Sequence, residues 1–518
     1  CGAQSNCVAL VPVETDLGRK RAIDQSACNL DFSCQKGFCP SFVSVVGGQR
    51  RQGSGGSGIS LDPKKELPNP EIPLLRAQYS IVLTGVGGTG VVTTGAIIGM
   101  AAHLAHLGCS VLDMAGLAQK GGAVTSHIIL APTPEDISAT HVADGGGDLL
   151  LGCDLVTSAA ASTRKKLNPR TTCAINTHQM MSGEFIHNPD QIFPVDALLE
   201  SVREAVPSGI LRTLPATELA KVAFGEVIVA NMIMLGYAQQ LGVLPIPPDA
   251  LERAIEINGQ SVEMNKQALQ LGRAFAFDPD GVGHELGLAP HAVRTASNER
   301  ADTRVSFLTD ILSQSHGSNA VAVLRGWLDR VGDQASPRVV SRLRAVVAES
   351  GFQVLYEKDE YEVARLYTRP EFREALAGEF TGSYRLKVHL APPLFFSRLD
   401  PATGRPAKVT FGSWIFVLFH LLRRVKSLRG RWCDPFRYSA ERRLTQQMQV
   451  EFEKTLERLL TIGIETENLD AALDIARWPL QVRGFGPVRQ GAFDKALSEL
   501  APKWEALETP LKRQVQAA

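Results

Sequence analysis

The chain of 518 residues has no excess charge, because 54 Lys and Arg residues balance 54 Asp and Glu residues. This balance gives no electrostatic reason to expect nucleic-acid binding or a polybasic membrane anchor. Long apolar runs are also missing, since Trp414 to Leu422 is too short to span a bilayer. No basic segment followed by an apolar one opens the chain. We therefore expect a cytoplasmic protein with no membrane span.

Several catalytic and metal-binding patterns are absent as well. The sequence contains no Gly-x-Ser-x-Gly elbow and no Walker loop. Its 11 histidines show no metal-ligand spacing, and its cysteines do not form the paired Cys-x2-4-Cys knuckles of structural zinc sites. The chain does not begin with Met, so we expect a fragment, a processed subunit or the tail of a longer polypeptide.

Cysteines are few but unevenly placed, and five of the nine stand in the first 40 residues. These five candidate metal ligands are Cys1, Cys7, Cys28, Cys34 and Cys39, the last followed by Pro40. A thiolate cluster that ends in Cys-Pro is similar to the close of a bacterial ferredoxin motif. Thiolates bind both iron–sulfur clusters and zinc, and the spacing favours iron–sulfur. Two ligand sets stay open: Cys1 with Cys39, or Cys7 with the three later cysteines.

The length predicts roughly two to four domains. A cysteine-rich, loop-like segment is expected over residues 1–50, and a Gly/Ser-rich and then Pro-rich linker over 51–76. Strand and helix patterns alternate over 77–275, which favours a mostly parallel sheet covered by helices. A Gly/Pro-containing connection follows at 276–300. Residues 301–518 show almost entirely helical spacing.

Short apolar runs predict strands, and longer periodic segments predict helices. The expected strands are 79–83, 110–114, 127–130, 148–151 and 173–175. The expected helices of the alternating region are 91–107, 217–241 and 248–275. Those of the C-terminal region are 305–313, 320–331, 337–350, 360–367, 370–379, 412–428, 440–460 and 469–476.

A glycine motif follows the first of these strands and opens the next helix. Gly85, Gly87 and Gly90 satisfy Gly-x-Gly-x-x-Gly, with Gly88 and Thr89 between them. Glycines at such a turn let backbone N–H groups approach an anionic group at a helix N-terminus. Asp113, at the end of the next strand, stands where a ribose-binding acid is expected in an NAD site. The alternative is a glycine turn needed only for close strand–helix packing.

Two basic segments are weaker candidates. Lys120, Gly121 and Gly122 form a basic loop suited to contact phosphate or a neighbouring subunit, although a lone lysine is more often solvated. The stretch 423–431 contains five Lys and Arg residues beside the apolar run 414–422. It is suited to meet an acidic partner or the phosphates of a cofactor such as coenzyme A. A solvated helix end is the plainer interpretation.

Taken in order, these segments resemble the C-terminal part of the long, fused indolepyruvate ferredoxin oxidoreductases, within the 2-oxoacid:ferredoxin oxidoreductase family. The stretch that ends in ACNLDFSCQKGFCPSF is similar to the ferredoxin-like segment of that family. GVGGTGVVTTGAIIGM, AQKGGAVTSHI and ANMIMLGYAQQLGVLPI are similar to its gamma-type catalytic domain. YEKDEYEVARLY, DPFRYSAERR and RGFGPVR resemble the extra C-terminal helical domain of the fused form.

The resemblance implies an α/β Rossmann-like gamma-type domain between an iron–sulfur segment and a mostly helical domain. It also implies oxidative decarboxylation of an aryl-pyruvate to its acyl-CoA by a homodimeric complete unit. The implied cofactors are [4Fe-4S] clusters, coenzyme A as co-substrate, and thiamine diphosphate with Mg²⁺. The thiamine-binding motif, roughly GDG…N, is absent from these residues, so a thiamine-binding N-terminal part or subunit is expected as partner. Ferredoxin is the implied electron acceptor.

Under this resemblance the glycine loop and the Lys120–Gly122 turn face thiamine diphosphate or coenzyme A, and Asp113 loses its role as a ribose ligand. Two other function classes are kept as alternatives. One is an NAD-dependent dehydrogenase that uses the loop Gly85–Gly90 with Asp113. The other is a non-catalytic scaffold subunit that carries zinc or no metal.

Overall fold

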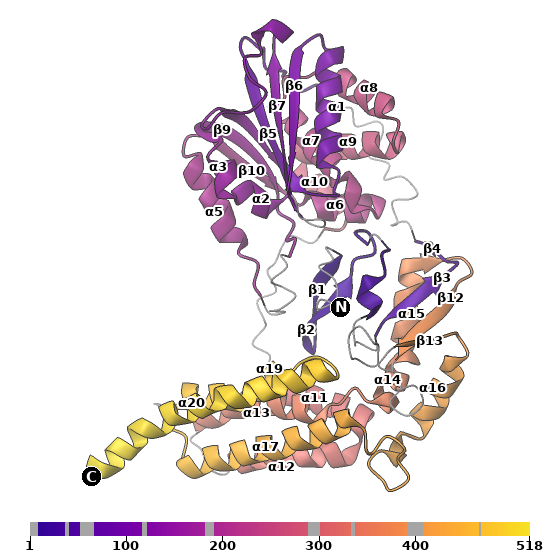
Figure 1. The fold of residues 1–518 in the computed structure, drawn as a ribbon, viewed down its shortest axis with the longest axis vertical. Helices are drawn as coiled ribbons and strands as arrows, with labels where there is room; N and C mark the ends of the chain where they lie inside the picture. Colours follow the sequence, from indigo (N-terminus) through magenta and orange to yellow (C-terminus); the bar gives the residue numbers. More distant parts are fainter. Residues whose placement is uncertain are drawn as a thin grey trace. The chain divides into compact units, whose positions relative to one another are not determined.

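The computed structural model describes residues 9–28, 30–36, 41–51, 67–116, 122–181, 191–288, 301–332, 337–390, 408–465 and 468–517. The chain divides into two compact units (Figure 1). The sheet unit comprises residues 2–34 and 51–292, and the helical unit comprises residue 1, 35–50 and 293–518. The cysteine-rich N-terminal segment is therefore shared between the two units.

A six-stranded sheet with the order β10-β9-β8-β5-β7-β6 organises the sheet unit. Its strands are β5 (Tyr79–Val86), β6 (Gly108–Ala115), β7 (Ala123–Ala131), β8 (Gly147–Gly152), β9 (Leu167–Asn176) and β10 (Ile210–Leu214). The pairs β10–β9, β9–β8 and β8–β5 are parallel, whereas β7 is antiparallel to both of its neighbours. The expectation of an α/β fold is confirmed, but the sheet is mixed.

Helices cover both faces of this sheet (Figure 1). Ile81 and Leu83 of β5 face a core built with α1 and α6 to α9, while Val82 faces a second core built with α2 and α5. The helices are α1 (Val91–Leu104), α2 (Leu155–Ala159), α3 (Ala161–Arg164), α5 (Val195–Ala205), α6 (Ala216–Phe224), α7 (Ala230–Gln240), α8 (Pro248–Asn258), α9 (Val262–Phe277) and α10 (Pro279–Glu285). Because side chains alternate along a strand, continuous apolar runs serve both cores.

The sequence missed β10 because that strand lies at the sheet edge and most of its side chains are not buried. It also predicted a loop-like segment for residues 1–50, which is wrong for the described part. There β1 (Leu10–Thr15) pairs with β2 (Gly18–Ile23), and β3 (Val43–Val46) and β4 (Gln49–Arg50) belong to the helical unit. β2 is a largely exposed, charged strand, and an exposed two-stranded ribbon needs no apolar alternation.

The described part of the helical unit contains ten α-helices, and the spacing predicted the first eight of them. They are α11 (Ala301–His316), α12 (Ser318–Gly332), α13 (Pro337–Leu355), α14 (Glu360–Tyr367), α15 (Pro370–Glu379), α16 (Ile415–Arg424), α17 (Ala440–Ile462), α18 (Leu469–Ala476), α19 (Trp478–Gln481) and α20 (Pro487–Ala517). A small sheet was not predicted: β12 (Arg385–Leu390) lies between β13 (Val409–Phe411) and β3. The short β11 (Phe380–Thr381) pairs with β4. No helix in the described part of the chain is long and apolar enough to cross a membrane.

A buried ion network at the start of α14 connects distant segments of the helical unit. The Asp359 carboxylate accepts hydrogen bonds from Nε and Nη2 of Arg429, at 2.6 and 2.7 Å, and from Nη2 of Arg442, at 2.8 Å. Burial opposes ionisation of Asp359, but the hydrogen bonds and charges of these arginines hold its pKa below the usual value. The network joins the YEKDEYEVARLY and DPFRYSAERR stretches.

We expect Asp359→Asn to lower the free energy of unfolding of the helical unit by about 3–5 kcal/mol, because two buried arginines lose their counter-charge. All five tryptophans lie between residues 327 and 504, so urea unfolding followed by tryptophan fluorescence reports on this unit alone. Asp470→Asn is the matched control, because its pair with Arg342 is solvent-exposed and is expected to contribute less than about 1 kcal/mol. Equal effects of the two substitutions would contradict a structural role for the buried network.

Candidate functional site at the carboxyl end of the sheet

The glycine loop connects β5 to α1 in very little space. A Cβ at Gly85 would overlap Cγ2 of Val91, the first residue of α1. Gly88 and Gly90 have φ angles of 85° and 91°, in the left-handed region where a side chain is strained. Close strand–helix packing therefore accounts for Gly85, and the tight turn accounts for Gly88 and Gly90. Gly87 is distinguished by its hydrogen bond.

That hydrogen bond brings together two segments that the sequence analysis had singled out separately. The N–H of Gly87 donates to the carbonyl of Gly122 at 2.8 Å. Lys120 and Gly121 lie outside the described residues. Thr89 is held from within the loop and from α7: its hydroxyl donates to the Val86 carbonyl at 2.7 Å, and its own carbonyl accepts from Nδ2 of Asn231 at 2.9 Å. Hydrogen bonds to Gly122, within the loop itself and to Asn231 of α7 thus fix the loop in place.

The N-terminus of α1 has no side-chain cap within the part of the chain that the structure describes, and its N-cap residue is Gly90. The first backbone N–H groups of a helix lack intrahelical acceptors, and the helix dipole favours negative charge beside them. The loop and helix end together are suited to bind an anionic group such as a phosphate.

The loop also lies at the point where the chain changes direction across the sheet. From β5 the chain passes through α1 toward β6 and β7, whereas from β8 it passes through α2 and α3 to β9 on the opposite side. β5 and β8 are adjacent and parallel. In open α/β sheets, ligands bind outside the carboxyl ends of the strands at such a switch point. The strand order therefore supports the same location as the loop geometry.

Polar side chains continue from this point along the sheet edge. At the N-cap of α2, the Asp154 carboxylate accepts from the N–H and the hydroxyl of Thr157, each at 2.7 Å. The Thr157 hydroxyl also lies 3.4 Å from the Gly85 carbonyl. At the end of β9, Nδ2 of Asn176 donates to the carbonyl of Cys153 and to the hydroxyl of Thr217, at 3.1 and 2.8 Å. These bonds hold the ends of β5, β8 and β9 in register.

A titratable pair lies at the far end of this edge. Nδ1 of His178 lies 3.1 Å from Oε1 of Glu218 in α6. The backbone N–H of His178 donates a hydrogen bond to Oδ1 of Asn176 at 3.3 Å. The imidazole is only partly exposed. A histidine beside a carboxylate is suited to accept and release a proton.

Asp113 is not placed as in an NAD site. It lies on β6, and β7 separates β6 from the strand that carries the glycine loop. Its carboxylate accepts a hydrogen bond from the hydroxyl of Ser126 on β7. In the dinucleotide-binding arrangement, the glycine-bearing strand and the strand with the acidic residue are neighbours. The strand order therefore disfavours the dehydrogenase alternative.

The cysteines divide into two chemical classes. Burial raises the pKa of Cys109 to about 11 and that of Cys173 to about 12, and burial with the nearby Asp154 raises the pKa of Cys153. Such thiols stay protonated at neutral pH and are poor nucleophiles. Cys28 and Cys34 are partly exposed, while Cys1, Cys7 and Cys39 lie outside the described residues. Across the described ranges, no group of three or more His, Cys, Asp or Glu could hold a metal ion.

Comparison with known proteins finds a family that matches most of the sheet unit. Residues 80–275 match the model of the family described as pyruvate ferredoxin/flavodoxin oxidoreductase. We call them the POR domain; they include the glycine loop and the polar edge described above. Residues 299–501 match a Family of unknown function (DUF6537).

Relatives of the POR domain carry a more specific name. The indolepyruvate oxidoreductase subunit IorB of Archaeoglobus fulgidus is 29% identical over 199 residues, which cover 38% of this chain and 94% of the relative. The subunit of the same name from Methanothermobacter thermautotrophicus is 27% identical over 196 residues, with 38% and 95% covered. The resemblance to the C-terminal part of an indolepyruvate ferredoxin oxidoreductase is confirmed.

Two solved structures resemble part of this chain. A pyruvate oxidoreductase subunit from Thermotoga maritima is 20% identical, with a TM-score of 0.29, and the match covers 38% of this chain and 97% of that one. The gamma subunit of a keto/oxoacid ferredoxin oxidoreductase from Geobacter sulfurreducens is 22% identical, with a TM-score of 0.27 and 38% and 98% covered.

Sequence reasoning missed several polar residues at the carboxyl edge of the sheet in the POR domain. Asp154, Asn176 and Glu218 belong to no short motif, because they come from segments far apart in the chain and meet only where the parallel strands end. Asn231 lay within a stretch noted for its similarity, ANMIMLGYAQQLGVLPI, although its role was not recognised. An amide at the start of a nearly all-apolar buried helix was the available signal.

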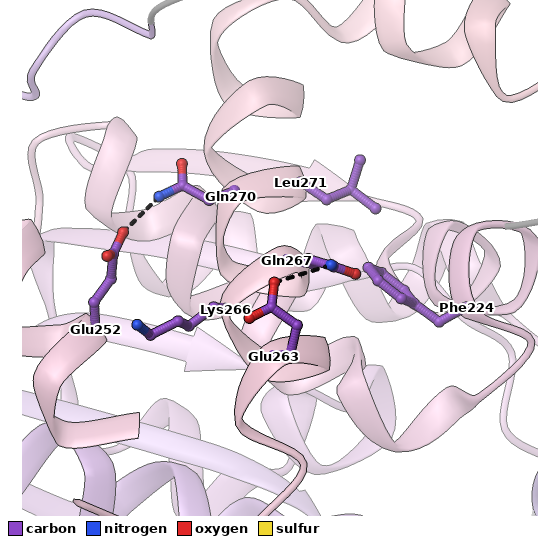
Figure 2. A pocket seen from close by; sticks show the side chains of 7 residues that line it. All are labelled: Phe224, Glu252, Glu263, Lys266, Gln267, Gln270 and Leu271. Carbon is purple, nitrogen blue, oxygen red and sulfur yellow. Dashed lines mark hydrogen bonds between the residues drawn. The ribbon is translucent and has the colours of Figure 1, made fainter. Parts of the chain in front are cut away.

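A separate hollow of about 370 Å³ lies over α6, α8 and α9 (Figure 2). Its lining residues are Phe224, Glu252, Glu263, Lys266, Gln267, Gln270 and Leu271. Nε2 of Gln270 donates to Glu252 at 2.7 Å, and Nε2 of Gln267 donates to Glu263 at 3.1 Å (Figure 2). Lys266 pairs with Glu256, which lies outside the lining. The polar groups of the hollow bond mainly with one another, and it shares no residue with the glycine loop.

We expect Gly85→Ala to lower the free energy of unfolding of the sheet unit by about 1–3 kcal/mol, because the added methyl overlaps Val91. Hydrogen exchange of residues 79–104 measures the loss. In the control Gly283→Ala, no atom lies within 4 Å of the added Cβ, and a change of at most about 1 kcal/mol is expected. The Gly85→Ala effect should also shrink in a Val91→Ala background. An undiminished effect there would refute the overlap as its cause.

Proposed function

We propose that this chain is part of a thiamine diphosphate-dependent 2-oxoacid:ferredoxin oxidoreductase that acts on indolepyruvate or another aryl-pyruvate. The observation that carries this proposal is the match of the POR domain to relatives named indolepyruvate oxidoreductase subunits. The substrate class is taken from the names of those relatives. The open helix end and glycine loop give this chain a site of suitable chemistry for the reaction.

The reaction balances as follows. One aryl-pyruvate, one coenzyme A and two oxidised ferredoxins yield one aryl-acetyl-CoA, one carbon dioxide, two reduced ferredoxins and one proton. Thiamine diphosphate with Mg²⁺, held by the thiamine-binding part, supplies the carbanion stabilisation that decarboxylation requires. Iron–sulfur clusters supply one-electron transfer, which matches an acceptor that takes one electron at a time.

Within this scheme the chain's own residues bind the phosphate of a cofactor and hold the binding loop in position. The loop Gly85–Gly90 and the N-terminus of α1 offer backbone N–H groups to a phosphate, which both coenzyme A and thiamine diphosphate carry. The Lys120–Gly122 turn adds a positive charge in sequence beside Gly122, the hydrogen-bond partner of Gly87. Asn231 and Thr157 hold the loop in place from either side. His178 with Glu218 is suited to move a proton at the same edge.

We assign the N-terminal cysteines as cluster ligands on their chemistry. Cys28 and Cys34 lie in partly exposed positions, unlike the buried Cys153 and Cys173. Iron–sulfur clusters are held by Cys thiolates. These two residues supply only part of a ligand set, and Cys1, Cys7 and Cys39 are the candidates for the rest.

The function is tested with the complete assembly, in which this chain is joined to its thiamine-binding part. Under anaerobic conditions, indolepyruvate and coenzyme A should reduce two ferredoxins for each indole-acetyl-CoA detected by mass spectrometry. Replacing ferredoxin by NAD⁺ is the control and should leave absorbance at the NADH wavelength unchanged. NAD⁺ reduction that Asp113→Ala weakens would instead establish the dehydrogenase alternative.

The metal assignment is tested on the purified chain. We expect Cys28→Ser and Cys34→Ser each to lower bound iron and acid-labile sulfide by at least about half, because a cluster normally needs four protein ligands. Cys433→Ser removes an exposed thiol outside the N-terminal group and should leave both contents unchanged. Stoichiometric zinc without sulfide in the unmodified protein would refute the iron–sulfur assignment and favour the scaffold alternative.

A further inference from the structure

One helix of the helical unit is apolar on both of its faces. The inner face of α16 packs Ile415, Phe416 and Phe419 into a hydrophobic cluster with Tyr367 of α14. The outer face, which we call the α16 patch, consists of Trp414, Val417, Leu418 and Leu421, which are 61%, 76%, 42% and 56% exposed. These positions follow the i, i+3, i+4, i+7 spacing of a single helix face.

Further exposed aromatic side chains follow in the same segment. Trp432 is 89% exposed and Tyr438 is 78% exposed. A soluble protein exposes single apolar residues everywhere, but grouped ones typically mark an interaction surface. Trp and Tyr are also the residues that most often dominate protein–protein binding energy. The composition of this segment therefore indicates a docking surface.

The segment that carries the patch has charges of one sign only. Between Lys408 and Cys433 the sequence has six Lys and Arg residues and no Asp or Glu. Arg429 is bound to the buried Asp359, which leaves Arg423, Arg424 and Arg431 on the exposed side. A second copy of this chain would bring its own arginines against these, and like charges repel. A partner with carboxylates around an apolar centre is complementary.

The patch belongs to the same module as the end of the cysteine-rich segment. β3, which begins four residues after Cys39, pairs with β12, and β12 pairs with β13 immediately before α16. With strands about 4.8 Å apart, β3 lies about 10 Å from β13. The side chain of Val43 packs against the cluster that contains Phe419, and Nζ of Lys408 lies 4.9 Å from the centre of the Phe42 ring.

We propose that the α16 patch is the docking surface for an acidic ferredoxin, with Arg423, Arg424 and Arg431 as its basic rim. This inference rests on the proposed function, in which ferredoxin is the electron acceptor. Each docking event passes one electron from the reduced enzyme to one oxidised ferredoxin. Two events therefore follow the oxidation of one 2-oxoacid.

The test measures binding without turnover. The full chain, reconstituted anaerobically with iron and sulfide, is titrated with an oxidised, acidic [4Fe-4S] ferredoxin by isothermal calorimetry at low salt. We expect Val417→Glu with Leu421→Glu to weaken binding at least tenfold, and Arg424→Glu with Arg431→Glu to weaken it at least fivefold. Added salt should weaken binding of the unmodified chain, because the rim contacts are exposed charge pairs.

The controls place the same chemical changes elsewhere on the helical unit. Val450→Glu alters an exposed apolar residue of α17, and Arg325→Glu alters an exposed arginine of α12. Both should bind ferredoxin within twofold of the unmodified chain. Matching circular dichroism and tryptophan-monitored unfolding confirm that each variant is folded.

Three outcomes overturn the proposal: no ferredoxin binding at low salt, equal binding by patch and control variants, or patch-dependent self-association in its place. Binding to vesicles of anionic phosphatidylglycerol, lost in the patch variants while ferredoxin does not bind, assigns the surface to a membrane and likewise overturns the proposal.

Reduction of a viologen dye by the complete assembly distinguishes a failure of the proposed function from a failure of the docking surface. Failure to reduce the dye contradicts the proposed function, whereas retained dye reduction with no loss of ferredoxin binding in the patch variants contradicts only the docking surface.

Discussion

The close approach of β5 to α1 at the glycine loop is the constraint on which the sheet unit depends. Gly85 leaves room for Val91, and the left-handed Gly88 and Gly90 turn the chain within four residues. The helix can then start directly above the end of a buried strand. The same compact turn directs unpaired backbone N–H groups of α1 toward the carboxyl edge of the sheet. Strand–helix packing and the proposed anion site thus depend on the same turn.

In the helical unit the corresponding constraint is electrostatic. Asp359 is ionised inside the fold because arginines from two other segments bind it. Arg429 follows α16 by five residues, so this buried contact also fixes where the C-terminal end of α16 lies. The exposed apolar face of that helix is therefore held by a network that is itself out of solvent. A rigid helix loses little conformational freedom when it binds a partner.

The sequence was most informative where the signal was local. Apolar runs and helical spacing placed five strands of the sheet and eight helices of the helical unit, because burial imposes a period on neighbouring residues. It failed where partners were remote or exposure removed the period. The edge strand β10, the charged β2 and the pairing of β3 with β12 have no local signature. The reversed direction of β7 likewise depends on which strands meet, which no short pattern encodes.

The sequence by itself determined the glycine turn, the alternation of strands and helices, the clustered cysteines and the resemblance to the oxidoreductase family, since each is written in contiguous residues. Tertiary structure alone decided that Gly87 meets Gly122, and that Asp113 lies one strand away from the loop rather than beside it. It also decided that the hydrophobic run 414–422 has one buried and one exposed face. Composition specifies which residues are apolar, but only the packing of α14 against α16 specifies which of them stay in contact with water.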